Sequence, residues 1–272
     1  MATPFTPLTS RQHPVVQACR ELASARGDGR TVLLDGAHLI AEAFRSGIPI
    51  DSVLAGARFL EESGHDGRTL LGRIQQTGGT IFDASDAVIA AASPVRTPSG
   101  VVAIARWAPV APAEVFAPDP ALAVGLYGVQ DPGNLGAGIR SADALGATGV
   151  VSIGHAADPA GWKALRGAMG STFRLPVSRA SLEDLLAAGT ARHVTVLAAT
   201  ARGGVALPDA PLTGPVLLLF GGEGAGLPDA VIPAGATRLT IPMRAGVESL
   251  NVAVAVGLVL YEARRQRQAG GR

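Results

Sequence analysis

The sequence predicts an α/β protein built from two units. Short apolar runs typical of buried strands alternate with helical patterns along the chain, and a proline-rich stretch at residues 106–121 interrupts this alternation. The 272 residues are 47% hydrophobic and 17% charged, which is enough apolar material for a large core or for two smaller ones. We therefore expect a first domain at residues 1–105, a linker at residues 106–121 and a second domain at residues 122–272.

The first unit begins with a helix and then alternates strands with helices. Gly47 is expected to end its second helix, and Ser85 or Asp86 to cap its last one. Helices are predicted at residues 13–25, 37–47, 68–79 and 86–93, and strands at residues 31–36, 51–56, 80–85 and 100–106. This order favours a layered α/β sheet.

The second unit contains continuous apolar strands, the kind that a parallel sheet buries on both faces. Strands are predicted at residues 122–129, 149–154, 194–200 and 215–221, and helices near residues 135–146, 160–169, 181–188 and 249–266. The linker separates the units because its prolines exclude a regular helix or a central strand.

Composition narrows the class of protein. The formal net charge of +1 argues neither for nor against nucleic acid as a partner, and the use of arginine with a single lysine is typical of genomic base bias. A lone cysteine excludes a disulfide within the chain, and the histidines show no metal-ligand spacing. No signal peptide is apparent, and the longest apolar run, residues 252–260, is too short to span a membrane. We expect a cytoplasmic protein.

The first motif follows the strand that ends near residue 129. Its glycines do not match the dinucleotide fingerprint, which argues against a nicotinamide-dependent oxidoreductase. Asn134 is predicted to cap the helix, and Gly136 and Arg140 lie four residues apart on one helical face. The Arg140 side chain would then pass over Gly136 towards the helix N-terminus, where anions bind. The alternative is that Arg140 forms a surface ion pair.

The second motif is a turn of clustered glycines at residues 221–226, after a buried strand. Such a turn lets the backbone approach a ligand closely, and the absence of a following Lys-Ser/Thr pair excludes a P-loop. Glu223 could accept hydrogen bonds from a ligand, or could only complement a helix dipole.

The third motif joins a short strand predicted at residues 240–243 to the last helix. Ser249 is expected to cap that helix. The helix is apolar nearly all round, so we expect it to be buried, within the domain or at a subunit contact. Asn251, at the N-terminal end of this helix, therefore needs a hydrogen-bond partner.

Together, and in this order, the motifs resemble the SpoU-type RNA ribose 2′-O-methyltransferases of the SPOUT class. The resemblance covers the second unit and is carried by residues 134–140, 221–227 and 241–251, with further similarity at residues 164–177. It implies a C-terminal knotted parallel-sheet domain (a trefoil knot), a homodimer formed through that domain, and a small α/β RNA-binding domain in front. It also implies S-adenosylmethionine as methyl donor, at a site formed by Gly221, Ile241, Leu250, Ala198, Thr200 and Met243.

The implied reaction moves a methyl group from S-adenosylmethionine to a ribose 2′-hydroxyl in structured RNA, with ribosomal RNA favoured over transfer RNA. The residues that the resemblance places at the reaction are Arg140, Asn134, Glu223, Ser249 and Asn251. Because arginine is very hard to deprotonate, we expect Arg140 to stabilise the developing alkoxide while a phosphate or water takes the proton. The alternative function is that of a catalytically silent RNA-binding or assembly factor on the same fold.

Overall fold

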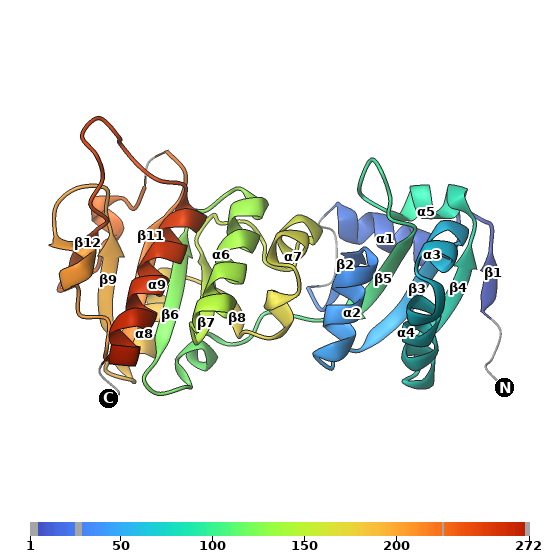
Figure 1. Cartoon of the computed structure of the whole chain (residues 1–272), viewed down its shortest axis with the longest axis horizontal. Helices are drawn as coiled ribbons and strands as arrows, with labels where there is room; N and C mark the ends of the chain where they lie inside the picture. The colour runs from blue at the N-terminus through green and yellow to red at the C-terminus, as the bar shows by residue number, and fades with distance from the viewer. Residues whose placement is uncertain (1–4, 25–28, 225, 270–272) are drawn as a thin grey trace. The chain divides into compact units, whose positions relative to one another are not determined.

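The computed structural model describes residues 5–24, 29–224 and 226–269, and the chain forms two compact units (Figure 1). One unit consists of residues 1–108 together with residues 160–173, and the other of residues 109–159 and 174–272. The predicted end of the first helix, residue 25, and Ala225 of the glycine turn lie outside the described residues.

The first unit is a five-stranded sheet between two layers of helices, with strand order β1-β4-β3-β5-β2. Among the described strands of this sheet, only β5 runs antiparallel to its neighbours. Along β2, Val32 and Leu34 pack with α2 and α4 on one face, while Leu33 packs with α1 and α5 on the other. The strands are β1 (Thr6–Leu8), β2 (Thr31–Asp35), β3 (Ile50–Gly56), β4 (Thr80–Ala84) and β5 (Val101–Arg106). The helices are α1 (Pro14–Ala23), α2 (Ala37–Arg45), α3 (Ala57–Glu62), α4 (Gly64–Gln76) and α5 (Asp86–Ala92).

The first unit also contains a segment from much later in the chain, α7 (Trp162–Ala168) and the 3-10 turn η2 (Ser171–Phe173). This segment packs on β2, the edge strand of the sheet. Leu165 is fully buried in the core on the α2 side, and Trp162 packs against the core on the α1 side. A covered edge strand cannot pair with another chain. The sequence places residues 160–169 in the second domain, so this packing differs from the expectation.

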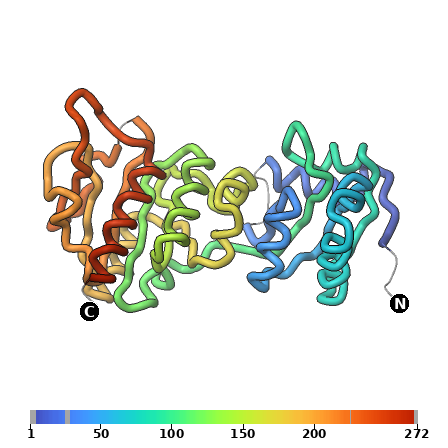
Figure 2. The backbone as a smooth tube through the Cα atoms, in the orientation of Figure 1, coloured from blue at the N-terminus to red at the C-terminus, as the bar shows by residue number. Residues whose placement is uncertain are grey.

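The second unit is a seven-stranded sheet of order β10-β12-β9-β11-β6-β7-β8 in which every described pair is parallel. Helix α8 packs on one face, while α6 and α9 lie side by side over the other (Figures 1 and 2). The strands are β6 (Leu122–Tyr127), β7 (Gly149–Ile153), β8 (Val177–Ala180), β9 (Thr195–Ala199), β10 (Val205–Ala206), β11 (Val216–Gly221) and β12 (Thr237–Thr240). The helices are α6 (Pro132–Leu145), α8 (Leu182–Thr190) and α9 (Val252–Ala269).

The position expected for one strand is wrong. The strand expected at residues 240–243 lies earlier, at β12, because Pro242 cannot donate to a ladder. In the stretch expected to be a linker, β5 ends at Arg106, as predicted, and the 3-10 turn η1 (Pro112–Phe116) places Val115 and Phe116 in the core of the second unit. None of the helices in the described ranges combines the length and hydropathy needed to cross a bilayer.

Candidate active site

A cavity of about 690 Å³ lies at the carboxyl ends of the strands in the second unit. Parallel strands present their carboxyl ends at one edge of a sheet, and ligands of α/β proteins bind there. Three segments line the cavity: residues 199–202 after β9, residues 220–229 after β11, and residues 238–255, which include β12 and the start of α9. The last two of these segments carry the second and third sequence motifs.

Most residues expected to hold the methyl donor line this cavity. They are Gly221, Ile241, Leu250, Thr200 and Met243. Ala198 does not line it, because its side chain is buried among the residues that pack under α8. Side chains alternate along a strand, so the next residue, Ala199, faces the cavity instead.

The glycine turn is compact because its backbone segments touch. A Cβ on Gly221 would lie 2.0 Å from the carbonyl carbon of Gly226, and a Cβ on Gly222 would lie 2.2 Å from the carbonyl oxygen of Gly128. Gly222 and Gly226 also form an antiparallel bridge. Glycine is therefore required at Gly221 and Gly222 for close backbone approach, and the turn holds its shape beside the loop that follows β6.

A chain of hydrogen bonds joins the three motifs beside the cavity. The Asn134 side-chain amide donates to Glu223 Oε1 at 2.6 Å, and Asn251 Nδ2 donates to Asn134 Oδ1 at 2.9 Å. Asn251 Oδ1 in turn accepts from the backbone N–H groups of Ala253 and Val254. Since backbone donors fix the oxygen of Asn251, each amide along the chain has one orientation that satisfies its partners. The carboxylate of Glu223 ends this relay.

Two helix caps differ from the sequence expectation. Helix α6 begins earlier than expected, so Asp131 is its N-cap and accepts from the Asn134 backbone N–H at 2.9 Å. At α9 the capping side chain is Asn251 rather than Ser249, which lines the cavity. These shifts leave the Asn134 side chain available for the relay. The Asp-Pro pair at the start of α6 is the sequence signal for its cap.

Arg140 lies away from this cavity. Its side chain is exposed on α6, and within the described residues it has no hydrogen bond or ion pair, so a surface ion pair does not account for it. Asn134 and Arg140 are six residues apart, about 240° around a helix, so the two side chains face different directions. The structure thus brings Asn134, Glu223, Ser249 and Asn251 together and leaves Arg140 outside the cavity of its own chain.

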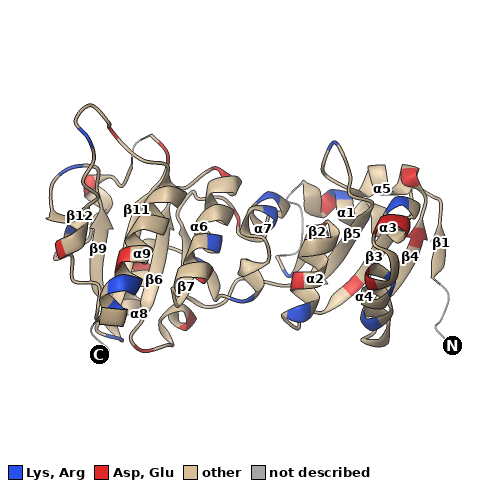
Figure 3. Cartoon of the chain, in the orientation of Figure 1, with Lys and Arg blue, Asp and Glu red and all other residues tan. Residues whose placement is uncertain are grey.

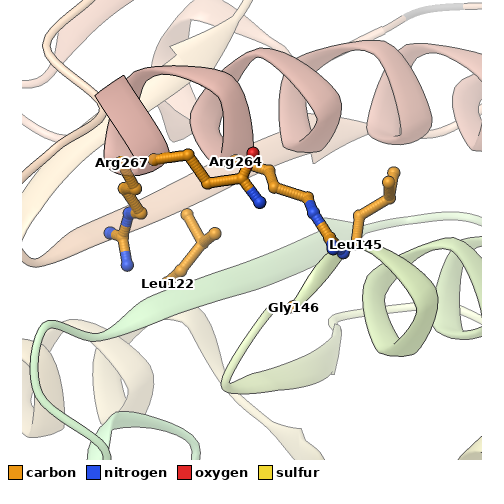
Figure 4. A pocket seen from close by; sticks show the side chains of 6 residues that line it. Leu122, Leu145, Gly146, Arg264 and Arg267 are labelled. Atoms are coloured by element: carbon orange, nitrogen blue, oxygen red, sulfur yellow. The ribbon is translucent and has the colours of Figure 1, made fainter. Parts of the chain in front are cut away.

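A smaller pocket of about 300 Å³ lies near the C-terminal end of α9 (Figure 4). Its lining includes Leu122 at the start of β6, and so it lies at the opposite end of the sheet from the larger cavity. The Arg267 guanidinium beside it donates to backbone carbonyls, and Arg264 donates to the Ala144 carbonyl. These hydrogen bonds hold the C-terminal end of α9 in place. No group of three or more potential metal ligands occurs among the described residues.

Comparisons with known proteins agree with this geometry. Residues 121–261 match the SpoU rRNA Methylase family. The chain is 32% identical to an uncharacterized tRNA/rRNA methyltransferase of Synechocystis, over 96% of this chain and 94% of that protein. It is 31% identical to the 23S rRNA (guanosine(2553)-2′-O)-methyltransferase of Bacillus subtilis, over 86% of this chain and 88% of that protein.

Solved structures show a similar relationship over nearly the whole chain. The S-adenosylmethionine-bound rRNA methyltransferase from Sinorhizobium meliloti aligns with a TM-score of 0.84 at 30% identity, covering 96% of this chain and 98% of that one. The SpoU methyltransferase AviRb from Streptomyces viridochromogenes, also bound to S-adenosylmethionine, aligns with a TM-score of 0.85 at 29% identity, covering 95% and 99%. The chain belongs to the SpoU rRNA methylase family.

Proposed function

We propose that this chain transfers the methyl group of S-adenosylmethionine to a ribose 2′-hydroxyl of ribosomal RNA. Family membership supports the reaction class, and the names of the relatives support the choice of RNA. The observation within the chain that carries the proposal is the relay from Glu223 through Asn134 to Asn251 beside the cavity. A ribosomal RNA substrate, as in the bacterial relatives, would place the reaction in the cytoplasm.

The cavity fits the proposed methyl donor. Its volume lies within the range of about 300–1,000 Å³ that is typical of small-molecule sites. Apolar side chains such as Ile241 and Leu250 suit an adenine ring, and the carboxylates of Glu223 and Glu248 suit a positively charged sulfonium compound. S-adenosylmethionine supplies an electrophilic methyl carbon when bound.

The residues of the chain act by positioning and by electrostatics. The relay holds the Glu223 carboxylate and the Asn134 amide in fixed orientations, and we propose that these two groups bind and orient the acceptor ribose. The Ser249 hydroxyl, at the cavity wall, adds a further hydrogen-bonding group. Arg140 stays protonated and stabilises the alkoxide that forms on the 2′-oxygen, while a backbone phosphate or water accepts the proton.

The position of Arg140 supports a site shared between two subunits. Because Arg140 lies outside the cavity of its own chain, we propose that Arg140 of the partner subunit completes each site in a homodimer. Helix α9 offers a surface for this contact, since Val254, Leu258 and Tyr261 are 51%, 43% and 63% exposed and share one face. We also propose that the segments around the cavity form a trefoil knot, and that residues 1–105 form an RNA-binding domain ahead of the methyltransferase domain at residues 122–272.

Methyl incorporation from tritiated S-adenosylmethionine tests the function directly. The acceptors are ribosomal and transfer RNA, each purified from cells that lack this protein. We expect label in ribosomal RNA, recovered as a 2′-O-methylated nucleoside, and a loss of about 10²–10³-fold in rate for Arg140→Ala with donor affinity unchanged. Arg68→Ala is the control and should leave the rate unchanged, since Arg68 is also exposed and has no ion pair within the described residues.

Other outcomes would overturn parts of the proposal. Label confined to transfer RNA would contradict the choice of substrate. RNA and donor binding without incorporation into either RNA would favour the catalytically silent RNA-binding factor.

A further inference from the structure

Helix α7 and its C-cap carry two cations and an exposed apolar side chain that do not pack in a hydrophobic core. Lys163 and Arg166 lie three residues apart on one side of α7, and Met169 follows as the C-cap residue of the same helix. All three are exposed, Met169 to 40%. Trp162 is half-buried at the start of the helix, and the Lys163 ammonium lies 5.5 Å from the centroid of its ring. We name these four residues the basic α7 face; the blue bands on α7 in Figure 3 mark its cations.

The cations of this face lack acidic partners. Residues 159–173 include no Asp or Glu, and within the described residues neither Lys163 nor Arg166 forms an ion pair. By contrast, the exposed Arg58 is neutralised by Glu62 at 2.8 Å. Two adjacent, unneutralised cations attract a polyanion, because phosphate groups gain counterion release when they are contacted.

The backbone of Met169 supports a role for its side chain. Met169 ends α7 in the left-handed region with φ of 53°, where glycine is the usual residue. The described chain has one other such non-glycine residue, His193, which is of a type that adopts this conformation more readily. A strained backbone that presents an exposed methionine indicates a surface contact rather than a packing need.

We propose that the basic α7 face binds the RNA substrate through an unpaired segment. Lys163 and Arg166 contact phosphates, while Met169 and the edge of Trp162 contact an unstacked base. The mixture of cations with exposed apolar and aromatic groups distinguishes this face from a purely electrostatic patch. The proposal rests on RNA methylation as the function, and it adds an RNA contact outside the residues assigned to the reaction.

The single lysine of the chain permits a direct test in the unmodified protein. An amine-reactive acylating reagent can modify only Lys163 and the N-terminal amine, and peptide mass spectrometry separates the two. We expect ribosomal RNA to slow acylation of Lys163 at least fivefold, and high salt to restore it. An unchanged rate would overturn the proposal. Equal protection by polyglutamate at the same charge concentration would also overturn it, since the face would then bind any polyanion.

Substitutions test the contribution to substrate binding. We expect Lys163→Ala with Arg166→Ala to raise KM for RNA about tenfold at unchanged kcat. The slope of log Kd against log salt should fall by about 1.4, the value for two phosphate contacts on a single strand. The matched control, Arg68→Ala with Arg96→Ala, removes two exposed arginines that form no ion pair within the described residues of the first unit. An equal effect of the control would show a dependence on net charge alone and contradict the proposal.

Met169→Gly separates binding from folding. Glycine adopts the left-handed conformation without strain, so we expect a higher melting temperature together with weaker RNA binding at an unchanged salt slope. A higher melting temperature with unchanged RNA binding would show that Met169 does not contact the RNA. Methyl transfer to RNA without protection of Lys163 would refute the RNA contact and leave the proposed function intact. Protection of Lys163 without methyl transfer would refute the proposed function and leave the RNA contact intact.

Discussion

At the scale of single residues, Asn134 is the junction of the candidate active site. Its amide is the one group that contacts both Glu223 and Asn251 within the described residues. Asn134→Ala removes both hydrogen bonds, so we expect the rate of methyl transfer at saturating donor to fall about 10–100-fold. Because the site is open to solvent, the free energy of unfolding should fall by only about 1 kcal/mol. Single-turnover transfer and urea unfolding measure the two effects, and wild-type transfer would contradict the relay.

Predictions about single residues succeed where a polar side chain needs a hydrogen-bond partner. A partner for Asn251 is expected because the helix behind it is apolar, and Asn134 supplies it. The caps are less predictable, since two neighbouring polar residues compete and backbone geometry decides between them. Asp131 and Asn251 take the places expected for Asn134 and Ser249. Ala198 does not line the cavity, because a shift of one position along a strand reverses the direction of the side chain.

At the scale of elements, the glycine turn after β11 depends on the absence of side chains. A Cβ on Gly221 would meet backbone atoms, which cannot move aside as a flexible side chain can. We expect Gly221→Ala to lower the free energy of unfolding by about 1–3 kcal/mol and to weaken S-adenosylmethionine binding at least tenfold. Gly72→Ala in α4 meets nothing within 4 Å and should raise stability by about 0.5–1 kcal/mol. Urea unfolding and calorimetric titration with the donor would measure both variants.

The end of α9 is held by one arginine rather than by apolar contacts alone. The Arg267 guanidinium donates to the carbonyls of Leu212, Pro120, Ala121 and Gly214 at 2.6–3.0 Å, and its burial lowers its pKa. We expect Arg267→Ala to lower the free energy of unfolding by about 1.5–3 kcal/mol, because charged donors form strong hydrogen bonds and the carbonyls lose their partner.

Arg265→Ala, on the same helix, removes an exposed ion pair with Glu262 and should cost at most about 1 kcal/mol. Equal losses in thermal unfolding for the two variants would contradict the role of Arg267.

Long apolar strands are predictable from sequence, and short edge strands are not. Strands such as β11 carry a continuous apolar run that only a buried parallel strand explains. By contrast, β1 has three residues and β10 has two, which is too few to show a period. Neither is expected from the sequence, nor are α3 and β8. Their positions depend on neighbours that are distant along the chain, such as the pairing of β10 with β12.

At the scale of the whole molecule, the exposed face of α9 predicts self-association. Val254→Glu with Leu258→Glu places two charges on the face proposed to meet a second copy. We expect the wild type to sediment as a dimer and the variant as a folded monomer, since these side chains lie outside the core. If Arg140 acts across subunits, the monomeric variant should also lose methyl transfer. A wild type that is monomeric at micromolar concentration would refute the shared site.

The division into two units is only partly predictable. The proline-rich stretch and the motif order indicate where the second sheet begins, because both are local features of the chain. The packing of α7 with the first unit is not local: Leu165 joins a core whose other members precede residue 106. A single sequence gives no sign of such a contact, since the apolar pattern of α7 fits either unit equally well.

The return of residues 160–173 to the first unit limits how this protein can be cut or recombined. A fragment ending at residue 108 would lack the helix over β2 and would expose an edge strand and apolar core surface. Such a fragment should aggregate. A fragment in which residues 160–173 are joined to residue 108 by a short linker should stay in solution. Exchange of N-terminal domains between relatives would likewise have to carry this segment along. The segments that must be kept together in a fragment or a chimaera are therefore those that pack together, even where they are distant in the sequence.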